Sequence, residues 1–257
     1  MRIFRFEKNG EIKWGWMNEN LIGEIDGDPF LDFRRKEAIY TLDEVKILPP
    51  VSPSKIICVG RNYAAHAAEH NADVPEIPLL FLKPPSALIG HLDEIILPPQ
   101  SDQVEYEAEL AVVMGKQSRW LSPEDVEDAI FGYTIANDVT ARDLQRSDGQ
   151  WTRGKGFDTF CPLGPWIDTT LFPSDSLITC RLNDEVRQMS STRDMIFPVN
   201  HLIAFISSVM TLNVGDVILT GTPAGVGVLS AGDKIDIEIE GIGILSNQVV
   251  SSTRIIG

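Results

Sequence analysis

Three glutamates alternate with apolar residues in the stretch VEYEAELAVV, residues 104–113. The valines and the leucine around them are typical of a β-strand, whereas carboxylates are depleted in strands. Side chains two positions apart share one face of a strand, so Glu105, Glu107 and Glu109 would lie about 7 Å from one another. Unpaired like charges held that close repel. The stretch therefore predicts either a solvated strand face or a cation bound between the carboxylates.

Composition bounds the possible functions of the chain. Its 257 residues suffice for one large domain, or for one domain with a small attachment. The net charge of −15 argues against nucleic-acid and anionic membrane partners. The widely spaced Cys58, Cys161 and Cys180 form no CxxC pair, which disfavours a zinc site or a disulfide framework. The sequence shows neither a signal-peptide core nor a bilayer-spanning run, so we expect a cytoplasmic protein.

Strand patterns dominate both ends of the chain. Residues 1–27 alternate apolar and polar side chains between turn signals, which predicts a small meander of hairpins. The Pro/Ser cluster at residues 49–53 is the best linker candidate and divides a small N-terminal β domain, residues 1–50, from a larger domain, residues 51–257. The C-terminal segment from residue 215 reads as strand and turn throughout. We predict a β-rich α+β fold, a mixed sandwich or roll.

Three helices are predicted outside the N-terminal region, the first a short one over YAAHAAEH, residues 63–70. The segment SPEDVEDAIFGY offers Ser122 as an N-cap with Pro123 behind it. The segment PVNHLIAFISSVM, residues 198–210, has the strongest amphipathic helical period in the chain.

A third carboxylate is available to complete a metal site with Glu107 and Glu109. Asp138 follows an apolar run in YTIANDVTARDLQ, residues 133–145, where a strand is expected to end. Asp143 is a competitor in the same segment, although it could instead pair with a cation or cap a helix. Oxygen-only ligands suit a hard divalent cation such as Mg²⁺, Mn²⁺ or Ca²⁺.

The motif HAAEH, residues 66–70, has three readings. It matches the HxxEH pattern of one zinc peptidase class, with His66 and His70 on one helical face. Alternatively, Glu69 orients the imidazole of His66 and the pair acts as a general base without zinc. A partly exposed helix with polar residues on its wet side is the third reading.

Two glycine-containing loops carry further candidates. GTPAGVG, residues 221–227, lacks the spacing of a dinucleotide fingerprint, and its glycines would let the backbone and Thr222 approach a ligand closely. Lys155 stands between two glycines in another loop, where a lone lysine is most often a surface residue.

In combination these segments resemble the fumarylacetoacetate hydrolase family. The matching motifs cover residues 55–250 and follow in one order: GRNYAAHAAE, LFLKPPSALIG, VEYEAELAVVMGK, GYTIANDVTARDLQ, GKGFDTFCPLGPW and ILTGTPAGVG. The first fifty residues look like the small N-terminal β domain of some members. The resemblance implies a mixed β-roll that is usually a homodimer.

The resemblance also implies roles for individual residues. It implies a divalent metal, commonly Mg²⁺ or Mn²⁺, on three carboxylates, with Glu105 outside the cage as a bystander on the rim. It implies a His/Glu dyad on a lid-like segment and polar groups around the substrate. The implied metal ligands are Glu107, Glu109 and Asp138; the catalytic groups are His66, Glu69, Lys155 and Gln145; the substrate contacts are Arg61, Tyr63, Arg142 and Thr222.

The function that follows is enolate chemistry on a 2-oxo or 2,4-diketo acid. Our leading expectation is hydrolysis of a C–C bond in an acylpyruvate-type substrate, with His66 activating water and a metal stabilising the departing enolate. Isomerisation of 2-hydroxy-diene dioates and decarboxylation of oxaloacetate are the alternatives at the same site. A metal-binding protein without turnover is the remaining class, which His66, Glu69 and Lys155 argue against.

Overall fold

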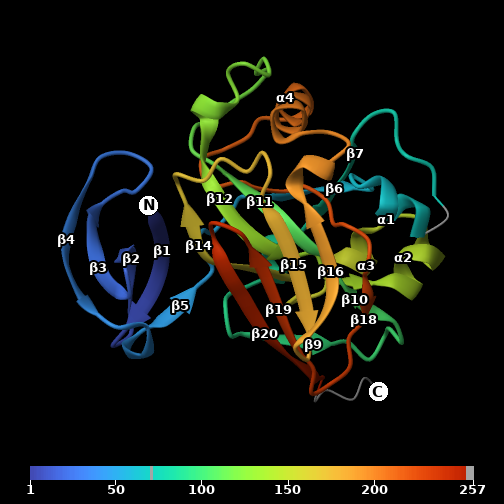
Figure 1. Cartoon of the computed structure of the whole chain (residues 1–257), viewed down its shortest axis with the longest axis horizontal. Coiled ribbons are helices and arrows are strands. Elements are labelled where there is room, and N and C mark those ends of the chain that lie inside the picture. The colour runs from blue at the N-terminus through green and yellow to red at the C-terminus, as the bar shows by residue number, and fades with distance from the viewer. Residues whose placement is uncertain (70–71, 253–257) are drawn as a thin grey trace.

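The first four strands form the antiparallel meander predicted for the N-terminal region (Figure 1). The computed structural model describes residues 1–69 and 72–252. The meander strands are β1 (Arg2–Lys8), β2 (Glu11–Asn18), β3 (Leu21–Gly27) and β4 (Phe33–Tyr40), and β5 (Lys46–Leu48) pairs with β1. Their small core contains Phe4, Phe6, Ile22 and Ile47.

The meander continues into a twelve-stranded mixed sheet. Strand β1 pairs antiparallel with β14 (Cys161–Asp168), with Ile3 opposite Ile167. The order then runs β14-β12-β11-β17-β6-β7, and β8 pairs parallel with β14. The remaining bounds are β12 (Ile130–Asn137), β11 (Ala108–Met114), β17 (Val217–Leu219), β6 (Ile56–Gly60), β7 (Leu79–Lys83) and β8 (Leu88–Ile89).

A five-stranded sheet packs against one face of the large sheet (Figure 1). Its order is β16 (Glu185–Ser191), β15 (Leu177–Leu182), β19 (Lys234–Ile239), β20 (Gly243–Ser251) and β9 (Glu94–Leu97). Leu110 and Val112 of β11 join Ile178 and Ile237 in the core on this face. Ala111 and Val113 enter a second core on the opposite face, so β11 is buried on both sides. The predicted β-rich α+β class with mixed sheets is confirmed.

The helices are short and lie around the sheets (Figure 1). The predicted amphipathic helix is α4 (Val199–Val209), which buries Leu202, Ile203 and Ile206 in the main core. The other helices are α1 (Ala64–Glu69), α2 (Arg142–Asp148) and α3 (Thr152–Lys155), with 3₁₀ turns η1 (Leu42–Glu44), η2 (Pro85–Ala87), η3 (Glu127–Ala129) and η4 (Thr192–Asp194).

The prediction of an α-helix that begins at Ser122 is wrong. The Ser122 hydroxyl instead donates to Asp125 Oδ2 at 2.8 Å, within a turn that leads to η3. Only Ala129 of that 3₁₀ turn is buried, so the segment has no apolar face long enough to stabilise an α-helix.

The prediction of a single strand over residues 104–113 is also wrong. The chain forms β10 (Val104–Tyr106), breaks at Glu107, and resumes as β11. Strand β10 belongs to a separate three-stranded sheet with β13 (Thr140–Ala141) and β18 (Gly227–Val228). The break turns the glutamates inward: Glu105, Glu107 and Glu109 are 5%, 4% and 1% exposed, which excludes a solvated strand face.

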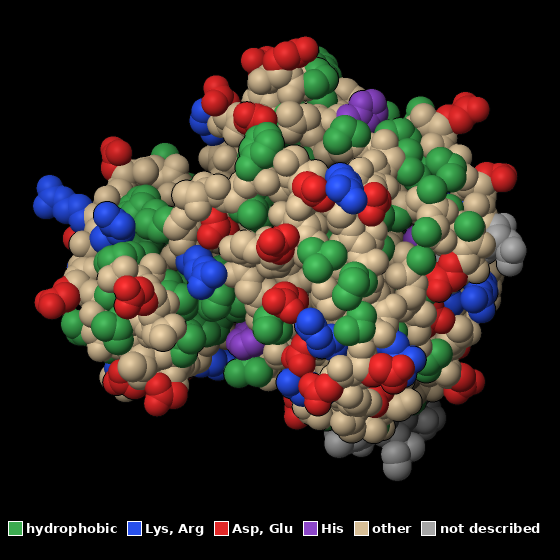
Figure 2. Space-filling view, in the orientation of Figure 1, with side chains coloured by type: hydrophobic (Ala, Val, Ile, Leu, Met, Phe, Trp, Pro, Cys, Tyr) green, Lys and Arg blue, Asp and Glu red, His purple; other side chains and the backbone are tan. Residues whose placement is uncertain are grey.

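The surface is rich in acidic side chains, which are spread over both lobes in Figure 2. All three cysteines are buried free thiols. Among residues 1–69 and 72–252, every helix is too short or too polar to cross a bilayer.

Buried Asp216 ties the start of the large domain to the turn before β17. Its carboxylate accepts hydrogen bonds from the backbone N–H groups of Ser54 and Asn213 at 3.1 and 2.7 Å, and it pairs with Lys55. We expect Asp216→Ala to lower the free energy of unfolding by about 3 kcal/mol, because it leaves buried donors unsatisfied. Urea denaturation measures this loss. Glu238→Ala, which breaks a half-exposed ion pair with Arg181, should cost less than about 1 kcal/mol. Equal losses in the two variants would contradict the structural role of Asp216.

Candidate active site

The strand break at Glu107 brings two segments of the chain together. The Glu107 N–H donates to the side chain of Asn137 at 3.0 Å, and the Asp138 N–H donates to the Glu107 carbonyl at 2.9 Å. Asp138 therefore follows the end of β12 directly beside the break, as predicted from its place in the sequence. These backbone contacts hold Glu107 and Asp138 next to each other, directly at the ends of strands.

Three buried carboxylates converge at this point. One oxygen from each of Glu107, Glu109 and Asp138 lies within 4.8 Å of the others. The competitor Asp143 points elsewhere, because its carboxylate accepts from the Ser101 hydroxyl at 2.6 Å and the Asp102 N–H at 2.9 Å.

Cationic side chains neutralise most of this cluster. Lys155 Nζ lies 2.8 Å from Glu107 Oε2 and 2.7 Å from Asp138 Oδ2, so one ammonium joins two carboxylates. Lys83 Nζ lies 2.6 Å from the other Asp138 oxygen. Arg142 pairs with Glu107 through Nη2. Burial opposes charge on Glu107, yet Lys155 and Arg142 hold the pKa of its carboxyl well below the usual range.

Glu105 has a different place from the one expected. It stays outside the group of three, but it is buried rather than a bystander on the rim. Its carboxylate accepts from Arg142 Nε at 2.7 Å and from the Gln103 amide at 2.6 Å. Glu105 thus holds the guanidinium that faces Glu107.

Glu109 is the carboxylate of this cluster that forms no ion pair with a residue in 1–69 or 72–252. The Gly221 N–H donates a hydrogen bond to its Oε2 at 2.7 Å. Gly221 has φ of +101°, and a Cβ there would meet the Cβ of Asn62 at 2.6 Å, so the close approach requires glycine. Burial, and then the carboxylates of Asp138 and Glu107, raise the pKa of Glu109 well above its usual value.

This donor set fits a hard divalent cation. All three groups offer carboxylate oxygens, and four buried carboxylates, Glu105 included, face three cations. The Lys155 ammonium already occupies a position between two of them, which shows that the cluster accepts positive charge there. The residues that would hold the metal are Glu107, Glu109 and Asp138.

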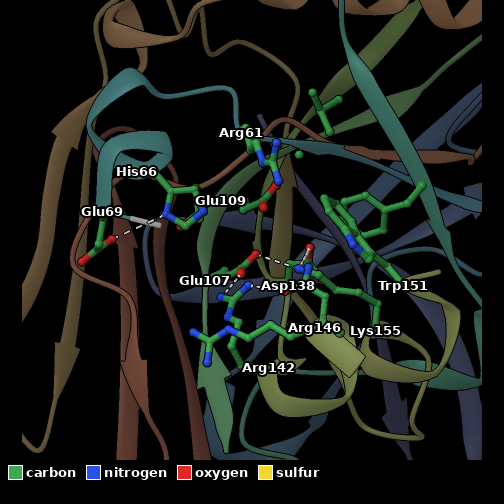
Figure 3. Close-up of a pocket in the computed structure, with 15 residues that line it drawn as sticks. Arg61, His66, Glu69, Glu107, Glu109, Asp138, Arg142, Arg146, Trp151 and Lys155 are labelled. Carbon is green, nitrogen blue, oxygen red and sulfur yellow. Dashed lines mark hydrogen bonds and ion pairs between the residues drawn. The ribbon is translucent and has the colours of Figure 1, made fainter. Parts of the chain in front are cut away.

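The His/Glu pair lies across the cavity from Lys155 (Figure 3). His66 is 6% exposed on α1, and its Nδ1 lies 3.6 Å from Glu69 Oε2. The Gly225 N–H donates to both oxygens of Glu69 at 3.2 Å and so anchors the carboxylate. This arrangement orients the imidazole as a general base requires.

One cavity of about 330 Å³ collects these groups (Figure 3). Every residue predicted for the site lines it except Tyr63. Those lining it are Arg61, His66, Glu69, Glu107, Glu109, Asp138, Arg142, Gln145, Lys155 and Thr222.

Comparisons with known proteins identify the relatives of this arrangement. Residues 55–250 match the family described as fumarylacetoacetate (FAA) hydrolase C-terminal. The chain belongs to the fumarylacetoacetate hydrolase family. Residues 1–50 match a second family, Rv2993c-like N-terminal.

Individual relatives of this fumarylacetoacetate hydrolase family member cover most of its length. An uncharacterised protein of Archaeoglobus fulgidus is 54% identical over 97% of this chain and 96% of its own. The mitochondrial oxaloacetate tautomerase FAHD2A of Bos taurus is 47% identical over 80% of this chain and 70% of its own. The crystal structure of 2-hydroxyhepta-2,4-diene-1,7-dioate isomerase from Mycobacterium marinum superposes with a TM-score of 0.92 at 42% identity, over 99% of this chain and all of that one.

Among the expected substrate contacts of this family member, Tyr63 is buried away from the cavity, and Arg142 and Thr222 already form hydrogen bonds within the protein. Tyr63 is 2% exposed in the main core, where burial raises the pKa of its phenol. The Arg142 guanidinium donates hydrogen bonds to Glu105, Glu107 and the Gln145 amide oxygen, the last at 2.6 Å. The Thr222 hydroxyl donates to the Ala108 carbonyl at 2.9 Å.

Sequence reasoning missed four residues of the site. Phe81, Arg146 and Trp151 line the cavity, and Lys83 lies behind Asp138. Lys83 could have been found, because a lysine inside the apolar strand LLFLK needs a buried partner. The zinc peptidase reading paired His66 with His70, and His70 lies outside the described residues.

Replacement of Glu109 by glutamine should change two quantities, the metal-induced rise in melting temperature and the stability of the metal-free protein. We expect Mg²⁺ or Mn²⁺ to raise the melting temperature of the wild type, because metal at one hundred times Kd adds about 2.7 kcal/mol to the free energy of unfolding. Glu109→Gln should lose this shift, while its metal-free form is at least as stable as the wild type, since a buried unpaired charge is gone. Differential scanning calorimetry measures both quantities.

Asp143→Asn is the matched control, because Asp143 lies in the same region and outside the three-carboxylate group. It should keep the metal-induced shift. A full shift in Glu109→Gln would exclude Glu109 as a ligand.

The pairing of Lys83 predicts a loss of stability on its removal. Lys83→Met leaves one oxygen of Asp138 without its cation in the interior, which should cost about 3–5 kcal/mol of unfolding free energy. Chemical denaturation of Lys83→Met beside Lys234→Met, whose ammonium is exposed, gives the comparison. Similar small losses in both variants would contradict a neutralising role for Lys83.

Proposed function

We propose that the protein interconverts the keto and enol forms of small 2-oxo dicarboxylic acids such as oxaloacetate. The observation that carries this proposal is the His66–Glu69 pair facing a buried three-carboxylate group across one small cavity. The oxaloacetate tautomerase and diene-dioate isomerase among its relatives support it.

The residues divide the work between charge stabilisation and proton transfer. A divalent cation held by Glu107, Glu109 and Asp138 would supply Lewis-acid stabilisation of negative charge on the 2-oxo oxygen of the substrate. Lys155 uses two of its three N–H donors on Glu107 and Asp138, and the third remains for the same oxygen.

His66 is the group that moves the proton. Its Nδ1 faces Glu69, which leaves Nε2 toward the cavity. In the keto-to-enol direction the C3–H bond breaks and its electron pair forms the C2=C3 bond. The carbonyl electrons move to O2, which takes up a proton. The imidazole accepts the proton from C3 and returns one to O2, and the Glu69 carboxylate stabilises the transient imidazolium.

Hydrolysis of a C–C bond in a 2,4-diketo acid is the second candidate, and one observation favours it. Gln145 gives its amide oxygen to Arg142, so its NH₂ group is available beside Lys155 to stabilise an oxyanion. His66 would then deprotonate water, which attacks the distal carbonyl. Oxaloacetate has a carboxylate at that position, so the choice of substrate separates the two reactions.

A substrate panel distinguishes these functions. We expect the Mg²⁺- or Mn²⁺-loaded enzyme to accelerate the loss of enol absorbance from oxaloacetate, with little pyruvate released. His66→Gln should reduce kcat by about 10²–10⁴-fold, the usual contribution of a general base. His201→Gln is the control, because His201 lies on α4 outside the cavity.

Pyruvate release from acetylpyruvate or fumarylpyruvate would instead support hydrolysis, and pyruvate release from oxaloacetate would support decarboxylation. Metal binding without turnover of any substrate would favour a binding protein. The homodimer stays a prediction from the family resemblance.

A further inference from the structure

The cations at the site fall into two groups by their partners. Lys83, Arg142 and Lys155 each form an ion pair with a buried carboxylate. Arg61 and Arg146 also line the cavity, and neither forms an ion pair with any residue in 1–69 or 72–252. The cavity therefore contains two guanidinium groups whose charge the described part of the protein leaves unbalanced.

Arg146 is placed to meet a substrate that has entered the cavity. It lies on α2 four residues after Arg142, so both side chains project from the same side of the helix. Arg146 is exposed, and its Nη1 donates to the neutral Gln103 amide oxygen at 3.3 Å. Arg142 is buried, and its guanidinium donates to Glu105, Glu107 and Gln145.

Several exposed arginines of this chain, such as Arg34, Arg35 and Arg119, form no ion pair with a described residue. Arg146 differs from them because its side chain lines the cavity. A planar guanidinium matches a carboxylate with two parallel hydrogen bonds. We therefore expect a carboxylate of the ligand to be the partner of Arg146 at the cavity.

We propose that Arg146 is a specificity residue that binds the distal carboxylate of a dianionic 2-oxo acid. This inference rests on the proposed function, which puts the 2-oxo acid end of the substrate beside Glu107, Glu109 and Asp138. The distal carboxylate then extends to the cavity wall formed by α2. Arg61 lies on the other side of the carboxylates in Figure 3 and keeps the substrate-binding role expected for it.

The test compares two substrates that differ only in the distal charge. Oxaloacetate and its 4-methyl ester share the 2-oxo acid end, and only the first has a second carboxylate. We expect Arg146→Gln to raise KM for oxaloacetate about tenfold, with kcat unchanged and little effect on the ester. Arg146→Lys should recover part of the loss, and added salt should reduce the wild-type preference, since the contact is exposed.

Arg153→Gln is the matched control. Arg153 is an arginine of similar exposure on the neighbouring α3, outside the cavity, and should leave both substrates unaffected. Equal losses on the two substrates in Arg146→Gln, or no loss on either, would overturn the proposal.

A binding measurement separates this proposal from the tautomerase function. Isothermal titration of the Mn²⁺-loaded protein with 2-oxoglutarate and with 2-oxopentanoate compares a dianion and a monoanion of equal chain length. We expect tighter binding of 2-oxoglutarate, and loss of that preference in Arg146→Gln, even if oxaloacetate is not turned over. Equal affinity of the wild type for both ligands, or no binding of 2-oxoglutarate, would overturn the role of Arg146.

Discussion

The structure depends on neutralising a group of carboxylates in its interior. An isolated buried charge costs several kcal/mol, so each carboxylate needs a cation or donors at hydrogen-bond distance. Lys155 meets this need for two carboxylates at once, with its Nζ 2.8 Å from Glu107 and 2.7 Å from Asp138. Displacement of the Lys155 ammonium would therefore remove one cation from both carboxylates at once.

This requirement explains how the elements around the site are arranged. The chain over residues 104–113 divides at Glu107, whereas one continuous strand would hold its glutamates in a row on one face. Before the break, Glu105 lies in the small sheet and reaches Arg142 on α2; after it, Glu109 follows β11 to the Gly221 N–H. The break therefore directs glutamates from one short stretch to different partners.

The sequence predicted the fold class, the N-terminal meander and helix α4, because strong local periodicity determines each of them. It also singled out carboxylates that the structure brings together, through their spacing and through family resemblance. It did not predict Lys83, which meets Asp138 from 55 positions away, or the buried place of Glu105. Periodicity reports which face a residue takes on its own element and carries no information about long-range partners.

The charge balance connects the metal and the substrate under the proposed function. With every carboxylate ionised, four buried carboxylates face three cations, and the metal-free cluster has one negative charge in excess. A divalent cation would reverse the sign of this balance. Arg61 and Arg146 then add to a positive site instead of opposing a negative one. Under the proposed function, the carboxylates therefore bind the cation, and Arg61 and Arg146 bind the anionic substrate. The site suits a small dianion only when the cation is bound.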